Sequence, residues 1–194
     1  MMDKTDLNRD NIIDFIGDIF RRLGADSYLG EAVTMTEHML QTARNAEQAG
    51  ESDETITAAL LHDIGHYTGE FPENYIDLGV NNKHETMGSA ILEKFFPPEV
   101  TEPVRWHVEA KRYLCATEDD YFAGLSDASV KTLHLQGGPY DETQCTEFEE
   151  NPYLETILNV RRYDDGGKVP GVETPDLDHY LEIAQKVLER QPAS

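Results

Sequence analysis

Apolar residues recur three or four positions apart along most of this chain, and no stretch of useful length alternates as a β-strand would. Residues 10–23 illustrate the pattern. Ile12, Phe15 and Ile19 lie on one helical face there, and Gly24 ends the run. The periodicity therefore predicts an all-α fold, a bundle of helices joined by short loops.

Turn-forming residues between the periodic segments set the expected helix boundaries. Further helices are expected at about 30–48, from Asp53 through Asp63, and at about 84–96, 99–113, 118–123, 126–133 and 149–162. Asp26 or Ser27 is the expected cap of the helix at 30–48. Residues 67–83 and 135–144 are expected to be loops, because Gly, Pro and Asn gather in the first and a double Gly lies in the second.

The C-terminal part of the chain contains residues typical of the start of a helix. Thr174 as N-cap and Pro175 at the first helical position predict a last helix at about 175–190. A chain of this length fits one domain, so we expect a single domain over residues 1–194 with its core at about 12–170.

Acidic residues dominate the charge, with 38 Asp and Glu against 16 Lys and Arg and a formal net charge of -22. This balance argues against nucleic acid and anionic membranes as partners, because phosphate groups need a basic face. No apolar run approaches the roughly 18 residues of a membrane span, and the polar N-terminus lacks a signal segment, so a cytoplasmic protein is expected. Cys115 and Cys145 have no metal-site spacing, and a disulfide between them is not expected.

The strongest local motif is HDIGH at 62–66. His62 and Asp63 are adjacent and project about 100° apart at a helix end. The imidazole can then bind a metal ion while the carboxylate reaches the same ion and, through its second oxygen, another. By itself such a pair is also common by chance.

The other candidate ligands are weak when taken singly. His38 and His107 lie in helical segments where packed histidines are common, and His84 opens a helix where a capping role would suffice. Asp164, beside Arg161 and Arg162, could merely form surface ion pairs. His134 and His179 have no supporting context and are expected to be structural.

The order of these residues is more specific than any one of them. His38, then His62 with Asp63, then His84, His107 and Asp164 resembles the HD-domain superfamily, in the subgroup with six ligands and two metal ions; the resemblance covers roughly residues 12–170. It implies one metal ion held by His38, His62, Asp63 and Asp164, and a second held by Asp63, His84 and His107.

Two binuclear branches of that superfamily differ in chemistry. HD phosphodiesterases usually carry Lys after HDIG, whereas His66 follows here. The spacing from Asp164 to Lys168 is similar to that in the mixed-valent diiron oxygenases related to myo-inositol oxygenase, although this chain is much shorter than that enzyme. The resemblance thus implies an Fe(II)/Fe(III) pair and dioxygen. A binuclear phosphohydrolase acting on a nucleotide or phosphomonoester is the alternative, and a helical binding module with structural histidines is a third.

Within the oxygenases, the chain looks most like the branch that cleaves the C–P bond of 1-hydroxy-2-aminoethylphosphonates. That branch has a Tyr and a Glu three residues apart shortly before the first His ligand, as Tyr28 and Glu31 are here. The resemblance implies that Tyr28 occupies an open iron position until substrate displaces it, and that Glu31 contacts the substrate's cationic nitrogen. Helix-entry packing and a dipole-friendly acid are the plainer interpretation of both.

A phosphonate dianion needs fixed positive charge, which in so acidic a protein must be local to the pocket. Lys111 follows His107 by one helical turn, and Arg161 precedes Asp164 by three residues. Together with these cations, the resemblance implies substrate contacts at Tyr28, Glu31, His66, Lys111, Ser129, Arg161 and Lys168, with His66 and Lys111 as catalytic residues. It implies as substrate a 1-hydroxyphosphonate bearing either a primary ammonium or a trimethylammonium group, giving phosphate and glycine or glycine betaine.

Overall fold

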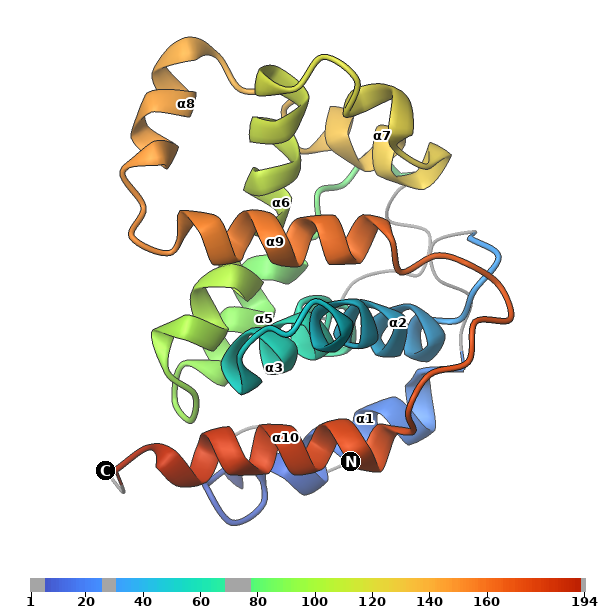
Figure 1. Cartoon of the computed structure of the whole chain (residues 1–194), viewed down its shortest axis with the longest axis vertical. Coiled ribbons are helices and arrows are strands. Elements are labelled where there is room, and N and C mark those ends of the chain that lie inside the picture. Colours follow the sequence, from blue (N-terminus) through green and yellow to red (C-terminus); the bar gives the residue numbers. More distant parts are fainter. Residues whose placement is uncertain (1–5, 26–30, 69–77, 193–194) are drawn as a thin grey trace.

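The computed structural model describes residues 6–25, 31–68 and 78–192, and helices make up its regular structure there, without a β-strand (Figure 1). The all-α prediction is confirmed. The helices are α1 Ile12–Leu23, α2 Met35–Gln48, α3 Asp53–Leu61, α4 Gly65–Thr68, α5 His84–Leu92, α6 Pro98–Thr117, α7 Asp127–Leu135, α8 Glu142–Glu149, α9 Leu154–Asp165 and α10 Leu177–Arg190, with a 3-10 turn, η2, at Phe122–Gly124.

The helices pack in layers around α9, which crosses the middle of the molecule (Figure 1). On one side α9 contacts α2 and α3, and α10 with α1 covers their far face. On the other side α9 packs against the long helix α6, and α8 and α7 lie to either side of α6 (Figure 1). Buried apolar residues from α1, α2, α3, α6 and α10 contribute to the main core, including Phe15, Met39, Leu60, Val104 and Tyr180. A second, smaller cluster of Ala110, Phe148 and Ile157 lies between α6, α8 and α9.

Two helices begin later than predicted because a different residue caps them. The side chain of Thr34 accepts a hydrogen bond from the backbone of Glu37, whose carboxylate accepts one from Thr34 in return, so α2 begins at Met35 rather than near residue 30. The predicted caps, Asp26 and Ser27, lie outside the described residues. Asp176 caps α10 in place of Thr174, which leaves Pro175 before the helix.

The segment between α6 and α9 departs most from the prediction. The helix expected at 118–123 is wrong, because α6 continues to Thr117 and only the 3-10 turn η2 follows. Helix α8 lies mostly outside the predicted elements. Asp141 starts it with a capping box, and Phe148 packs its inner face against Trp106 and Tyr113 of α6. That stabilising contact is tertiary and leaves no local periodicity.

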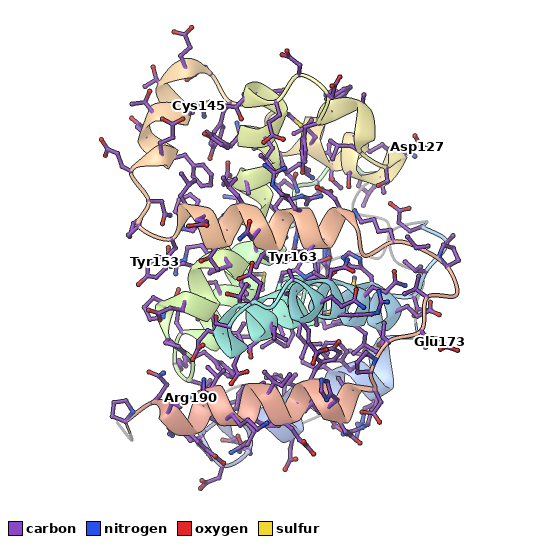
Figure 2. All side chains as sticks on the ribbon, in the orientation of Figure 1. Asp127, Cys145, Tyr153, Tyr163, Glu173 and Arg190 are labelled. Carbon is purple, nitrogen blue, oxygen red and sulfur yellow. The ribbon has the colours of Figure 1, made fainter. Side chains whose placement is uncertain are left out.

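Cys115 and Cys145 are both free thiols, as expected. Cys115 lies on α6, whereas Cys145 lies on α8 at the outer end of the molecule (Figure 2). Among the described helices none has the length and apolar character to cross a membrane.

Candidate metal centre

Six side chains converge where α2, α3, α5, α6 and α9 meet. His38 lies in α2, His62 caps the C-terminus of α3 and Asp63 follows it, His84 begins α5, His107 lies midway along α6, and Asp164 lies in the last turn of α9. All six are buried, with exposed fractions of 0 to 6%. The structure thus brings together every residue that the sequence proposed as a metal ligand.

The six side chains form two groups that share Asp63. In the first group, His38 Nε2 and His62 Nε2 are 3.2 Å apart and lie 3.6 and 3.5 Å from Asp63 Oδ2. In the second group, His84 Nε2 and His107 Nε2 are 3.1 Å apart and lie 3.1 and 3.4 Å from Asp63 Oδ1. The two oxygens of Asp63 therefore face different pairs of histidines, as a carboxylate bridging two cations would.

Asp164 completes the first group from the opposite side. Its Oδ1 lies 3.4 Å from His38 Nε2, and its Oδ2 lies 3.9 Å from His62 Nε2. The first group thus has two imidazoles and two carboxylates, whereas the second has two imidazoles and the shared carboxylate. The second group has fewer side chains that could hold a metal ion, and so more room for exogenous ligands.

The hydrogen bonds of the histidines test whether this centre suits cations. The outer ring nitrogens of three of them face backbone carbonyls: His38 Nδ1 faces Gly167, His62 Nδ1 faces Ala59 and His107 Nδ1 faces Val104, at 2.8 to 2.9 Å. Carbonyls only accept, so each Nδ1 carries the proton and each Nε2 presents a lone pair.

Lone pairs that face one another repel unless a cation lies between them. Among the described residues, Asp63 Oδ2 and Asp164 Oδ1 are also buried without a hydrogen bond. Nitrogen and oxygen lone pairs at this density fit two metal ions, and each Nδ1 contact fixes the ring orientation of a ligand.

The pKa values fit the same interpretation. Burial lowers the pKa of His38 to about 4 and also lowers that of His107, so both are neutral near pH 7. Burial alone would raise the pKa of Asp63, but His62 and His66 hold it well below its usual range. At His62 burial lowers the pKa, yet Asp63 outweighs it and the net shift is upward, so a proton competes with a metal ion there.

Two glycines allow the backbone to approach the ligands. A side chain at Gly65 would overlap the carbonyl of His84, so HDIG packs directly against the start of α5. A side chain at Gly167 would collide with Thr42 and crowd His38, whose Nδ1 donates to the Gly167 carbonyl.

A pocket opens beside the second group. Its lining includes His84 and His107 of that group together with Glu31, His66, Lys111, Ser129, Arg161 and Lys168. These are all of the predicted substrate contacts except Tyr28, which lies outside the described residues. Of the histidines expected to be structural, His179 pairs with Glu47 at 2.8 Å on the far layer, and His134 is exposed on α7.

Three cations line this pocket. Lys111 is only 3% exposed and donates to Thr132 Oγ1 at 2.8 Å. Lys168 Nζ donates to Ser129 Oγ at 3.0 Å, and Arg161 Nη1 lies 2.6 Å from Asp164 Oδ2. Burial and the neighbouring Arg161 lower the pKa of Lys111 to about 7. Crowded, desolvated positive charge of this kind is the environment that a phosphonate or phosphate group requires.

Comparison with known proteins agrees with this geometry. The HD domain matches residues 35–158. The chain is 51% identical over 188 residues to the 1-hydroxy-2-(trimethylamino)ethylphosphonate dioxygenase (glycine-betaine-forming) of Leisingera caerulea, covering 97% of this chain and 96% of that protein. It is 46% identical over 164 residues to the hydroxymethylphosphonate dioxygenase of Gimesia maris, covering 84% and 82%. The chain belongs to the HD-domain phosphonate dioxygenases.

The HD match includes five of the six side chains of the centre and ends before Asp164. In this HD-domain phosphonate dioxygenase, α9 therefore adds a carboxylate from beyond the matched segment. The same helix places Arg161 one turn before Asp164, so the Asp164 carboxylate and the Arg161 cation reach the pocket together.

A clamp on Arg161 was not foreseen from the sequence. Asp165 pairs side-on with Arg161, whose Nε lies 3.2 Å from Asp165 Oδ2 while Nη2 contacts Oδ1. Tyr121 donates to Asp165 Oδ2 at 2.5 Å and accepts from Arg161 Nε at 3.1 Å. The edge of the guanidinium formed by Nε and Nη2 is thus occupied, which leaves Nη1 directed at Asp164. The i,i+4 spacing of Arg161 and Asp165 was the available signal, but Tyr121 comes from a distant turn.

We predict that Asp165→Asn weakens phosphonate binding about tenfold, because Arg161 loses the charge-assisted, bidentate pair that orients it. Metal content should not change, since Asp165 lies outside both groups of ligands. The measurement is substrate KM together with metal analysis of the purified variant. Glu118→Gln is the matched control, since Glu118 holds the adjacent Arg162 in an exposed pair at 2.5 Å. Equal KM values for the two variants would rule out the orienting role of Asp165.

Proposed function

We propose that this protein cleaves the C–P bond of 1-hydroxy-2-(trimethylammonio)ethylphosphonate with dioxygen, releasing phosphate and glycine betaine. The 1-hydroxy-2-amino analogue, which would give glycine, is the second candidate substrate. The supporting observation is the pairing of a two-metal ligand set with three cations in one pocket. The reaction balances as one hydroxyphosphonate and one dioxygen giving one carboxylate and one phosphate, with carbon oxidised and dioxygen reduced.

We assign one iron ion to His38, His62, Asp63 and Asp164, and the other to Asp63, His84 and His107. Bound as an Fe(II)/Fe(III) pair, iron supplies the capacity to bind and reduce dioxygen. The protein's part is to fix the number of ligands and to leave positions open at the second group, on the pocket side.

The pocket residues would bind and orient the substrate. Lys111, Arg161 and Lys168 neutralise the phosphonate, and the Ser129 hydroxyl offers a further hydrogen bond. This arrangement directs C1 and its hydroxyl toward the second group. Glu31 lines the same pocket and, being acidic, suits the cationic nitrogen at the other end of the substrate. Tyr28, for which the resemblance implies a place beside the iron ions, lies outside the described residues.

The identity of the nitrogen group is the finer part of this proposal. A trimethylammonium group cannot donate hydrogen bonds, so only charge and aromatic or apolar contact recognise it. The 51% identity to the glycine-betaine-forming enzyme favours this substrate over the primary amine.

We predict that Glu31→Gln raises KM about tenfold for either cationic substrate, because a charge-assisted contact with the nitrogen is lost. Hydroxymethylphosphonate lacks the nitrogen, so its affinity for the protein should be the same in the variant and the wild type. Both affinities are measured, in the variant and the wild type, by letting the two phosphonates compete for the same site. An equal loss for both compounds would place Glu31 outside the nitrogen site, and loss of iron would move it to the metal ligands.

The oxygenase and the phosphohydrolase alternatives differ in what they need besides substrate. The oxygenase requires iron and dioxygen, whereas a binuclear hydrolase works anaerobically with Mn²⁺ or Mg²⁺ and on phosphate esters. We expect phosphate release from the hydroxyphosphonate only in air with iron, and none from nucleotides or phosphomonoesters. Full-rate phosphate release under nitrogen with Mn²⁺ would overturn the proposal.

A further inference from the structure

Asn82 lies between His84 of the metal centre and His66 of the adjacent pocket. Its side chain is buried, and its Oδ1 is 2.9 Å from His84 Nδ1 and 3.4 Å from the backbone N of His84. Its Nδ2 is 3.1 Å from His66 Nδ1. The rings of His66 and His84 are stacked, with centroids 4.0 Å apart and planes 17° apart. One amide therefore touches the outer nitrogen of both stacked rings.

The backbone N–H of His84 determines which way this amide points. That N–H can only donate, so the atom facing it must be the amide oxygen. A flipped amide would set an NH₂ group against this N–H and against His84 Nδ1. Nδ2 must consequently face His66.

The chain is bent to hold this arrangement. Lys83, between Asn82 and His84, has φ +48° and ψ +39°, in the left-handed region that side chains other than glycine seldom occupy. Strain of this kind persists where surrounding contacts determine the conformation. The bend folds the Asn82 amide back onto the first residue of α5.

The amide then dictates where each histidine carries its proton. His84 Nδ1 faces an acceptor and must donate, which leaves a lone pair at Nε2, toward His107 and Asp63. His66 Nδ1 faces a donor and must accept, so its proton lies on Nε2, 3.7 Å from Asp63 Oδ1. If His66 were doubly protonated, its Nδ1–H and the Asn82 Nδ2–H would be two donors facing each other. This contact therefore requires the neutral ring.

We propose that Asn82 is a positioning residue that imposes opposite tautomers on two stacked histidines, making His84 a metal ligand and His66 a hydrogen-bond donor to the pocket. In the reaction, which rests on the proposed function, His66 then donates to a substrate or product oxygen and does not act as the base. The assignment of the two rings itself does not depend on that reaction.

The test is nitrogen-15 NMR of the histidine rings in the full chain loaded with Zn²⁺, which is diamagnetic. We expect protonated Nε2 and unprotonated Nδ1 at His66, and the reverse proton position at His84. In Asn82→Asp both side-chain oxygens accept, so a proton should appear at His66 Nδ1. A wild-type His66 protonated at Nδ1, or a His66 spectrum unchanged by Asn82→Asp, would overturn the proposal.

Metal titration provides a second readout that involves no turnover. Asn82→Ala should weaken binding of one of the two Zn²⁺ ions about 10- to 100-fold, because His84 loses the contact that orients it. The other ion should bind as in the wild type. Asn81→Ala is the matched control, because Asn81 contacts the backbone of Lys83 and neither ring. Unchanged affinity at both sites in Asn82→Ala would contradict the positioning role, whether or not the protein cleaves phosphonates.

Discussion

Asp63→Asn is expected to abolish the two-metal centre, with bound metal falling from two ions to one or none and activity falling about 10³-fold or more. Asp63 is the only described side chain whose two oxygens face both groups of histidines, at 3.1 to 3.6 Å from four ring nitrogens. An asparagine offers one neutral oxygen in place of two anionic ones, so it cannot bridge. The measurement is metal analysis of the iron-loaded variant together with turnover.

His134→Gln is the control for that experiment, because His134 is exposed on α7 and belongs to neither group of candidate ligands. It should keep two ions and full activity. The helical content of both variants, measured by circular dichroism, should match that of the wild type. Two tightly bound ions in Asp63→Asn would show that Asp63 does not bridge, and the assignment of the centre would be wrong.

Lys111→Met is expected to raise the substrate KM about 100-fold. Lys111 is 3% exposed, and removing one partner of a buried charge pair costs about 2–5 kcal/mol. Methionine has a similar length and carries no charge, so the fold should be as stable as the wild type or more stable. Binding to the iron-loaded protein without dioxygen, measured by calorimetry, separates affinity from turnover.

Lys111 should also make substrate binding depend on pH. Lys111 is charged below its pKa of about 7 and neutral above it. A bound phosphonate dianion raises that pKa, so binding near pH 8 should take up close to one proton, and affinity should fall as pH rises above 7. Calorimetry in two buffers of different ionisation enthalpy measures the uptake, which Lys111→Met should lack.

Lys131→Met is the matched control for Lys111, since Lys131 is an exposed lysine on α7. It should bind substrate as the wild type does. Wild-type affinity in Lys111→Met, or proton uptake unchanged by it, would remove Lys111 from the phosphonate site.

The all-α fold and the convergence of the six candidate ligands could be predicted, but for different reasons. Helical periodicity is a local property, so the spacing of apolar residues within α1 and within α10 is enough to predict these helices. The ligands were identified by their order along the sequence, since neither His38 nor His107 is distinctive alone. Burial and distance then depend on packing that no single segment encodes.

The supporting residues could not be predicted because their roles are tertiary. Asn82 acts on His66 from 16 positions away, and Tyr121 reaches Asp165 from 44 positions away. The carbonyl of Gly167 faces His38 Nδ1 from 129 positions away. The predicted starts of α2 and α10 were wrong for a related reason. Several residues at each start could cap the helix, and the hydrogen bond that forms selects one of them.

The most direct test of this account is the ratio of dioxygen consumed to phosphate released when the iron-loaded protein meets 1-hydroxy-2-(trimethylammonio)ethylphosphonate. Oxidative cleavage predicts one dioxygen per phosphate, glycine betaine in equal amount, and no phosphate without dioxygen. Phosphate released without consumption of dioxygen would contradict the central claim and make the protein a hydrolase.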